Sequence, residues 1–390
     1  MFYDFSHRLL ILSNMLIFRR DIESKINEHL TGKGMIIILG PRQSGKTTLG
    51  KKLIEPFGAQ GAYFNCEHAD VRRHFVLGEP DTLFALVADT QVVVFDEAQT
   101  IENIGKILKV FYDAHPHIKV IATGSSAFDL ANKIREPLTG RAFEYMLYPL
   151  SLGEVRSVCT VTPELLDDLM IFGSYPAVVA APTPERKREE IKNIATNYLY
   201  KDVFTFEAIR NPKAFEDLLT HLARRLGSTI STNDLSKELG ITQVTVEKYI
   251  RLLEQSFVIK RVYSFARNYA NELKKSYKVY FLDLGVRNAL VGGLNGGAAD
   301  PERGILFESF FFTELLKRDT GVPFPPKTYF WRTRDKKEID FIRVDGRSLH
   351  AYECKLTSQT DDFKTFLKHY PEAVARVITP DDLLRGEEFH

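Results

Sequence analysis

Short apolar runs alternate with stretches of helical periodicity along the first 150 residues. The runs have the length of buried strands and occur at Met35 to Leu39, Ala62 to Asn65, Val92 to Phe95, Ile118 to Ala122 and Phe143 to Leu147. Between them apolar residues recur at helical spacing, as they do near Thr82 to Ala88. Strands that alternate with helices in this way predict an α/β fold.

A different pattern begins after Asn211-Pro212, which interrupts a helical region rich in Tyr and Phe. Phe215 to Leu226 has apolar helical spacing, and two further helices follow, the first capped by Ser231-Thr232 and the second by Thr242. Gly240 turns the chain between these two. The arrangement predicts a helix-turn-helix.

Two predicted strands, Phe257 to Phe265 and Lys278 to Leu282, would form the wing of this unit. They enclose a basic connection with Arg267, Lys274 and Lys275. From residue 214 to 278, eleven Lys and Arg outnumber seven Asp and Glu, a surplus of four positive charges on an otherwise neutral chain. The bias favours a polyanionic partner, and DNA is the nucleic acid we expect.

The second helix of this unit should expose side chains of the types that contact base edges and phosphates. These are Gln243, Thr245, Lys248 and Arg251. Winged helices also serve as packing modules beside ATPase cores, and a surplus of four charges is modest. The sequence leaves both roles open.

The glycine-rich stretch Val291 to Ala299 precedes an apolar helix, Gly304 to Lys317, with one acid, Glu308, near its start. Further on, Glu338 to Val344 and Ser348 to Lys355 alternate like strands on either side of Asp345-Gly346. This dipeptide is favoured in two-residue turns, so a hairpin is predicted.

With Asp345-Gly346 at the turn, Asp340 would lie opposite Ala351. The two-residue repeat then places Asp340, Glu353 and Lys355 on one face, which also carries Ile342 and Leu349. Carboxylates among apolar neighbours are costly unless something compensates them, and a divalent metal held by Asp340 and Glu353 would do so.

The strand Met35 to Leu39 runs directly into a phosphate-binding pattern, Gly40-Pro41-Arg42-Gln43-Ser44-Gly45-Lys46-Thr47-Thr48, and a helix follows. In such a loop the backbone N–H groups and the positive helix N-terminus converge on phosphate oxygens. Lys46 is expected to contact the β- and γ-phosphates of ATP, and Thr47 to hold Mg²⁺. The alternative, a chance glycine-rich turn, is disfavoured by the flanking strand and helix.

Asp96 and Glu97 follow the strand Val92 to Phe95, at the strand edge where ligands of α/β sheets bind. Asp96 fits the partner of Mg²⁺, and Glu97 fits the base that orients the attacking water. A solvated strand end is the alternative. The strand Ala62 to Asn65 separates the loop from this pair, an order that resembles the additional-strand, AAA-like ATPases. Asn132-Lys133-Ile134-Arg135 lacks the aspartate of a guanine-reading motif, so ATP is preferred over GTP.

Two more residues are candidates for the phosphoryl-transfer site. Ser125, in Thr123-Gly124-Ser125-Ser126, is a candidate γ-phosphate sensor, although Ser and Thr after a strand also cap helices, and the sequence leaves the two roles open. Arg141 is a candidate for the positive charge that stabilises phosphoryl transfer. Whether it acts in its own subunit or in a neighbour is not readable.

With these motifs in place, the chain resembles the archaeal and bacterial ATPases of the AAA_14 type, whose C-terminal portion is the domain of unknown function DUF4143. The resemblance spans nearly the whole chain and is carried by Leu39 to Thr48, Phe95-Asp96-Glu97-Ala98-Gln99, Thr123 to Ser126, Gly140-Arg141, Gly173-Ser174-Tyr175-Pro176 and Lys278 to Asp283. The family has Gly-Gly where this chain has Gly173-Ser174.

The C-terminal acids resemble a PD-(D/E)xK nuclease site. That resemblance implies that Glu308, Asp340 and Glu353 lie on the metal side and that Lys355 helps water attack a phosphodiester. The alternative is a salt-bridged structural pair in a fold that has lost its chemistry, which the resemblance to DUF4143 also allows.

The bulk composition adds three points. A chain of 390 residues exceeds one hydrophobic core, and its 52 basic and 51 acidic residues cancel, so global charge indicates no partner. The three cysteines, Cys66, Cys159 and Cys354, form no Cys-x-x-Cys pair, which favours a reducing cytoplasm.

The apolar run Leu9 to Phe18 is too short to cross a bilayer, so no membrane association is expected. Met15 resembles a natural start, which would make residues 1–14 an upstream extension.

We therefore expect an N-terminal segment and helix at 1–30, an α/β ATPase core at 31–150, a helical lid at 151–210, a winged helix at 211–290 and a nuclease-like α/β domain at 300–390. The functional hypothesis is an ATPase associated with nucleic acid, in which the ATP or ADP state controls a winged helix and a metal-dependent nuclease domain. The rival is a regulatory ATP switch with protein-binding downstream domains and no nuclease activity. A small-molecule kinase is disfavoured by Glu97 and the winged helix, and the oligomeric state is not readable.

Overall fold

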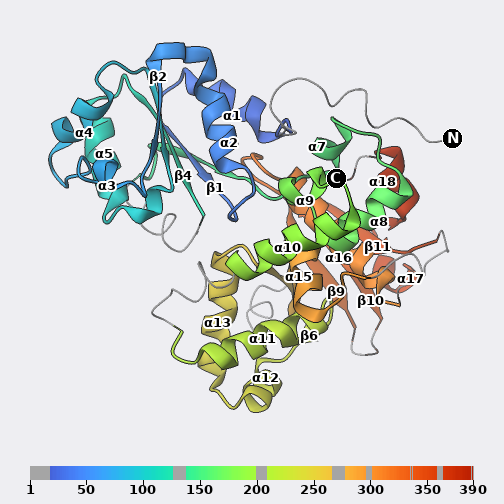
Figure 1. Cartoon of the computed structure of the whole chain (residues 1–390). Coiled ribbons are helices and arrows are strands. Elements are labelled where there is room, and N and C mark those ends of the chain that lie inside the picture. The colour runs from blue at the N-terminus through green and yellow to red at the C-terminus, as the bar shows by residue number, and fades with distance from the viewer. Residues whose placement is uncertain are drawn as a thin grey trace.

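The computed structural model describes residues 18–125, 138–198, 209–265, 277–295, 301–333, 335, 337–357, 363–387 and 389 (Figure 1). The expectations for residues 1–14, Ser126, Asn132 to Arg135 and the basic connection with Arg267, Lys274 and Lys275 lie outside these residues.

The first body is built on a five-stranded sheet in which neighbouring strands are parallel. Its order is β2 (Gly61–Asn65), β3 (Val92–Asp96), β4 (Lys119–Gly124), β1 (Met35–Leu39) and β5 (Ala142–Met146). The strand between β1 and β3 in space is β4, and β2 lies at the sheet edge. Parallel strands are joined by crossovers, so β2 separates the loop from Asp96 along the chain only.

Helices cover both faces of this sheet (Figure 1). Alternate residues of β1 point to opposite faces. Met35, Ile37 and Leu39 share a core with α4 (Pro80–Val87) and α5 (Ile104–Ala114). The intervening residues of β1 pack with α1 (Ile22–Leu30) and α2 (Lys46–Ile54). Burial on both faces explains why β1 is a continuous apolar run. A short helix, α3 (Ala69–Arg72), and two 3₁₀ turns, η1 (Glu55–Gln60) and η2 (Ala98–Thr100), complete the body.

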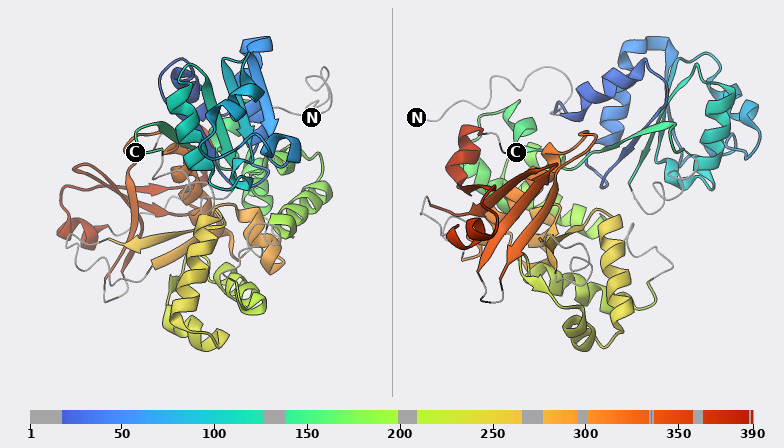
Figure 2. Two further views of the ribbon diagram at one scale, coloured as in Figure 1. Left: turned by 90° about the vertical axis from the view of Figure 1, so that its left-hand side faces the viewer. Right: turned by 180° about the vertical axis from the view of Figure 1, so that it is seen from behind.

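The second body contains a mixed seven-stranded sheet. Its order is β12 (Val374–Ile378), β11 (Ser348–Cys354), β10 (Glu338–Asp345), β9 (Lys327–Arg332), β7 (Ile259–Ser264), β8 (Tyr277–Phe281) and β6 (Thr229–Ile230). A parallel pairing of β7 with β9 joins the two halves of this sheet (Figure 2). The segments 211–290 and 300–390, which the sequence predicts as separate units, therefore share one sheet.

The helices of the second body surround this sheet, and most of them contribute to its main core. Four of them begin after a Ser, Thr or Asn whose side chain caps the helix, as the sequence patterns indicate. The described helices of this body are α7 (Leu152–Arg156), α8 (Pro163–Phe172), α9 (Pro176–Ala180), α10 (Pro184–Tyr198), α11 (Pro212–Arg224), α12 (Thr232–Leu239), α13 (Gln243–Gln255), α15 (Leu284–Val291), α16 (Arg303–Arg318), α17 (Lys364–His369) and α18 (Pro380–Arg385).

The Gly173-Ser174 motif has a structural role in this body. Gly173 has φ +83°, and a Cβ there would lie 2.1 Å from a carboxylate oxygen of Asp283. The Ser174 N–H donates to Asp283 at 2.8 Å, and Asp283 in turn caps α15. The Ser174 hydroxyl, where the family has a second glycine, lies 3.0 Å from Lys317 Nζ and accepts its hydrogen bond. The substitution thus adds an anchor for α16.

In the described part of the chain, no helix is long and apolar enough to cross a membrane.

Candidate functional site

The phosphate loop lies between β1 and α2, as the sequence predicts. Gly40 is required by a close approach, because a Cβ there would lie 2.1 Å from the Leu147 carbonyl oxygen. Lys46 is buried, and its ammonium donates to the carbonyls of Gly40 and Pro41 at 2.9 and 2.8 Å. The buried Ser44 hydroxyl has no hydrogen-bond partner among the described residues. These donors and the small residues of the loop fit the phosphates of a nucleotide.

The residues predicted to hold Mg²⁺ meet beside the loop. The Thr47 hydroxyl donates to Asp96 Oδ2 at 2.6 Å. Two residues that the sequence reasoning did not assign also bond Asp96: the Tyr63 hydroxyl donates to Oδ2 at 2.6 Å, and the Thr123 hydroxyl donates to Oδ1. Burial and the bond to Asp96 raise the pKa of Tyr63, so Tyr63 stays a hydrogen-bond donor. Oxygen ligands of this kind suit Mg²⁺.

Glu97 is held in a conformation that few glutamates adopt. Its φ is +54°, and Gln43 in the phosphate loop has φ +60°, which places two of the four non-glycine residues with positive φ in the described chain at the nucleotide site. Such strain persists where the surroundings enforce it. Gln99 Nε2 donates to Glu97 at 2.5 Å and to the Ser125 hydroxyl at 3.0 Å, and Ser125 lies 3.3 Å from Glu97. Ser125 therefore belongs to the Glu97 network.

Gln99 was quoted in the motif Phe95 to Gln99, and Thr123 in Thr123 to Ser126, so the sequence contained a signal for both. Their roles depend on side-chain contacts between strands, which no local pattern specifies. Tyr63 had no signal beyond its place in a predicted strand.

Arg141 does not reach the phosphate loop of its own chain. It precedes β5, whose first residue, Ala142, pairs with Met35 at the start of β1, whereas the loop follows the end of β1. Five residues of strand, about 16 Å, lie between the two levels. Arg141 forms a two-pronged ion pair with Asp113, with nitrogen–oxygen distances of 2.9 and 3.2 Å. Of the two alternatives that the sequence leaves open, a role within its own subunit does not fit this position, because the arginine lies at the opposite edge of a parallel sheet.

The C-terminal hairpin forms, but its register differs from the expected one. Asp345 pairs with Ser348, so the turn residues are Gly346 and Arg347. Gly346 has φ +57° and occupies the first central position, which type II′ turns reserve for glycine. The shift moves every pair by two positions, and Asp340 lies toward Glu353 instead of Ala351. An even shift preserves the predicted face.

The acids predicted for a nuclease-like site do come together. Asp340 lies at a β-bulge in β10 and accepts a hydrogen bond from the Cys354 N–H at 2.8 Å, and its own N–H lies 3.3 Å from Glu353. Lys355 Nζ lies 3.0 Å from Glu353. Burial, then the carboxylates of Glu308 and Glu353, raise the pKa of Asp340 well above its usual range.

A lysine that the sequence reasoning placed in the wing occupies the middle of these acids. Lys278 of β8 has a side chain only 3% exposed, and its ammonium lies 3.4 Å from Glu308 and 2.5 Å from Glu338. The Tyr280 hydroxyl donates to Glu308 at 2.5 Å. Burial lowers the pKa of Lys278, but the surrounding carboxylates outweigh it and the pKa is raised. Glu308, Asp340, Glu338 and Lys278 thus form an ion cluster contributed by both halves of the sheet.

These side chains do not fit the divalent metal predicted for Asp340 and Glu353. No group of three or more His, Cys, Asp or Glu side chains within the described ranges is arranged to hold a metal ion. The Lys278 ammonium pairs with Glu308 and Glu338 and brings positive charge close to Asp340, and Lys355 pairs with Glu353, so two lysines supply the charge that a metal would otherwise bring. The cluster is satisfied by ion pairs and hydrogen bonds.

Helix α13 presents most of the predicted DNA-contacting residues outward. Gln243, Lys248 and Arg251 are exposed, whereas Thr245 is half-buried and its hydroxyl lies 2.9 Å from that of Thr242. Gln243 donates to Asn233 at 2.9 Å. The exposed face therefore has two basic side chains, Lys248 and Arg251, and one amide, Gln243.

A cleft of about 870 Å³ opens between β5 of the first body and β7 and β9 of the second. Neither the phosphate loop nor the acid cluster lines it. The volume of this cleft therefore does not mark the nucleotide site or the acid cluster.

Three family models match successive parts of the chain. An AAA domain model, AAA_14, matches residues 32–156, a domain of unknown function, DUF8612, matches 163–295, and DUF4143 matches 303–385. The second and third meet between α15 and α16, although the sheet of the second body continues across this boundary.

Several known proteins are similar to the chain. An uncharacterized protein of Mycobacterium tuberculosis is 28% identical over 354 residues, covering 89% of this chain and 76% of that protein. One from Methanocaldococcus jannaschii is 24% identical over 378 residues, covering 90% and 81%. The RuvB Holliday junction branch migration motor of Thermotoga maritima has a TM-score of 0.34 at 14% identity, covering 63% of this chain and 90% of that one. AMPPCP-bound DnaA of Aquifex aeolicus has a TM-score of 0.32 at 13% identity, covering 60% and 86%. At such TM-scores neither structure bears on the function.

Proposed function

We propose that the chain, in which an AAA_14 domain is followed by DUF8612 and DUF4143 regions, hydrolyses ATP with Mg²⁺ and uses the nucleotide state to control a DNA-contacting region. The observation that carries the hydrolytic part is the contact of Thr47 with Asp96 at 2.6 Å, beside the network of Glu97, Gln99 and Ser125.

Each side chain of the site has a role that follows from its position. Lys46 would leave the loop carbonyls for the β- and γ-phosphate oxygens, and Thr47 and Asp96 would hold Mg²⁺. Bound Mg²⁺ neutralises negative charge on the phosphates. Glu97 would accept a hydrogen bond from the attacking water and orient it, while Ser125 holds the Glu97 carboxylate in place.

The test is the variant Glu97→Gln, which keeps the shape of the side chain and removes its basicity. We expect phosphate release to fall at least about 100-fold, since general-base catalysis contributes about that much, while ADP binding is retained. Glu102→Gln, a change at an exposed acid of the same loop, is the matched control and should turn over ATP normally. Unchanged turnover in Glu97→Gln would remove the assignment of the base.

DNA contact by α13 is supported by the exposure of Lys248 and Arg251 on the second helix of a helix-turn-helix, with β7 and β8 in the place of a wing. We expect the double variant Lys248→Ala/Arg251→Ala to weaken binding of a labelled duplex in fluorescence anisotropy and to lower the salt slope by about two, one for each lost phosphate contact. Lys192→Ala, at an exposed lysine of α10, is the control. Equal affinity and slope in all three proteins would favour a packing or protein-binding role for α13.

Metal-dependent cleavage of DNA is a second candidate, favoured by the convergence of Glu308, Asp340, Glu353 and Lys355. The position of Lys278 opposes it and favours the rival, an ATP switch without nuclease activity. Incubation of plasmid with the protein and Mg²⁺ or Mn²⁺ decides between them. Cleavage that Lys355→Ala abolishes supports the nuclease, and intact plasmid with ATP, ADP or no nucleotide supports the switch.

A further inference from the structure

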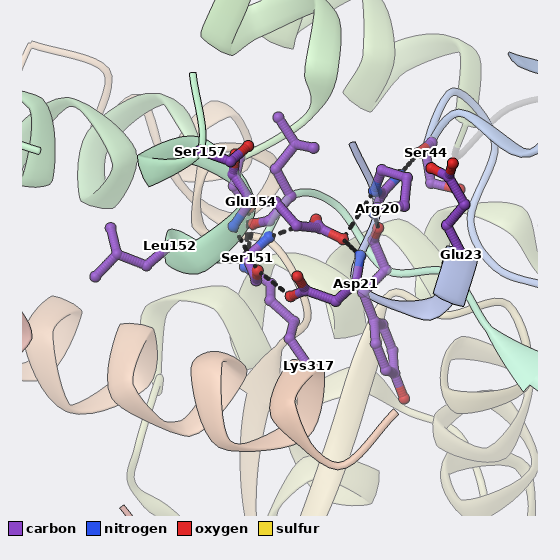
Figure 3. A network of polar contacts seen from close by, with 12 residues as sticks. Arg20, Asp21, Glu23, Ser44, Ser151, Leu152, Glu154, Ser157 and Lys317 are labelled. Carbon is purple, nitrogen blue, oxygen red and sulfur yellow. Dashed lines mark hydrogen bonds and ion pairs between the residues drawn. The ribbon is translucent and has the colours of Figure 1, made fainter. Parts of the chain in front are cut away.

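The segment that precedes α1 is anchored in both bodies and touches the phosphate loop between its anchors. Phe18 packs in the core of the second body, and Ile22 packs in the core of the first. Arg20 lies between them with 7% of its side chain exposed. Its Nη1 donates to the carbonyl oxygen of Ser44, in the phosphate loop, at 2.5 Å (Figure 3).

The rest of the Arg20 guanidinium is directed at the start of the second body. Nη2 donates to the Tyr148 carbonyl at 2.6 Å, and Nε lies 3.0 Å from Glu154 Oε1. Glu154 is 5% exposed and also accepts from the N–H groups of Asp21 and Ser151, at 2.8 and 2.9 Å. A buried ion pair whose two partners each make further hydrogen bonds favours one geometry. The pair therefore holds the phosphate loop against α7.

The peptide that carries this carboxylate is held from its other side by α16. The Leu152 N–H donates to Glu314 at 2.8 Å, and Lys317 donates to the Leu150 carbonyl at 2.8 Å. Lys317 and Glu314 also pair with each other at 2.8 Å. Glu308 of the acid cluster belongs to the same helix. A continuous series of polar contacts thus runs from the phosphate loop to α16.

We propose that Arg20 is a positioning residue for the phosphate loop and that the Arg20–Glu154 pair links nucleotide occupancy to α16. The Ser44 carbonyl and the Gly45 N–H share one planar peptide, so a hydrogen bond that fixes the oxygen also fixes the direction of the N–H. Backbone N–H groups of this loop are the phosphate ligands. A shift of the loop on nucleotide binding moves Arg20, and with it Glu154 and the peptide that α16 holds. The inference rests on the proposed nucleotide site, and it adds how that site communicates with the second body.

The first experiment compares Arg20→Met, Arg20→Lys and Glu154→Gln with Arg19→Met, the matched control at the exposed neighbouring arginine. The measurements are equilibrium binding of a fluorescent ADP analogue and ATP turnover at saturation. We expect Arg20→Met and Glu154→Gln to weaken ADP binding about tenfold, Arg20→Lys to recover part of the loss, and saturated turnover to stay within about twofold because no reacting group is changed. ADP affinity equal to wild type in both Arg20→Met and Glu154→Gln would overturn the positioning role.

The second experiment tests the link with hydrogen exchange of the full chain, at ADP concentrations that saturate each variant. In the wild type we expect ADP to change the protection of residues 303–318, and in Glu154→Gln we expect this change to be lost although ADP is bound. The same response of 303–318 in both proteins would overturn the link. Exchange and binding do not require hydrolysis, so a wild type that binds ADP without turning over ATP would refute the proposed hydrolysis and leave the link testable.

Discussion

Lys278→Met removes the cation that pairs with two carboxylates of the acid cluster, those of Glu308 and Glu338. The Lys278 side chain is 3% exposed, and its ammonium lies 3.4 Å from Glu308. At an effective dielectric constant of about 20, such a pair has a gross attraction of about 5 kcal/mol. The desolvation of both ions offsets much of that attraction. When only the lysine is removed, its attraction is lost while the carboxylates stay buried and desolvated, so we expect unfolding of the second body to become easier by about 3–5 kcal/mol.

The protein has its own reporter for this experiment, because Trp331 is the only tryptophan in the sequence. It lies in β9 with 7% of its surface exposed, within the sheet that carries the cluster. Urea unfolding followed by Trp331 fluorescence at neutral pH reports the free energy for this body. Lys260→Met, an exposed lysine of β7, is the control. A loss below about 1 kcal/mol in Lys278→Met would refute the view that the lysine compensates buried charge.

The same variant tests whether a divalent cation can take the place of the ammonium. If the vacated position binds Mn²⁺, a concentration of 100 times the Kd would return about 2.7 kcal/mol. No stabilisation by Mn²⁺ would show that the carboxylates are arranged for lysine alone.

Three further outcomes follow from particular contacts. The raised pKa of Asp340 means that the folded chain binds this proton more tightly than the unfolded chain, so its ionisation costs stability as pH rises above about 4. The urea midpoint of Asp340→Asn, relative to that of the wild type, should therefore increase between pH 5 and pH 8. A difference in midpoint that stays constant with pH would contradict this. Gly173→Ala should destabilise the second body by about 1–3 kcal/mol in urea unfolding, because its methyl group would overlap the Asp283 carboxylate; an unchanged midpoint would contradict it. Arg141→Met should leave ADP affinity unchanged, and a loss of turnover that depends on protein concentration would place Arg141 at a neighbour's site.

The parts that the sequence predicted well are those set by neighbouring residues. The phosphate loop needs only a strand, a glycine-rich turn and a helix in succession, so the pattern from Met35 to Ile54 located it. The caps Ser231 and Thr242 and the turn Gly240 placed α12 and α13 for the same reason. Each of these signals lies within a few residues of the structure it determines.

The parts that escaped prediction depend on pairs that are far apart in the chain. Lys278 meets Glu308 thirty residues later. Arg20 meets Ser44 24 residues later and Glu154 134 residues later. Charge counting included Lys278 in the basic surplus that favours a polyanionic partner, because a count measures surplus and not position. Whether Arg141 can reach the phosphate loop of its own chain depends on the pairing of β5 with β1, which no local pattern specifies.

The parallel pairing of β7 with β9 has a consequence for any attempt to divide this protein. A cut between residues 295 and 301 follows the boundary between two sequence families, yet it leaves β7 with an open edge of unpaired amides and carbonyls in one fragment and β9 in the other. Such edges recruit strands from other molecules. The boundary between the two sequence families therefore does not coincide with a boundary of the folded structure. Each half of the sheet covers the strand edge that the other half would otherwise expose.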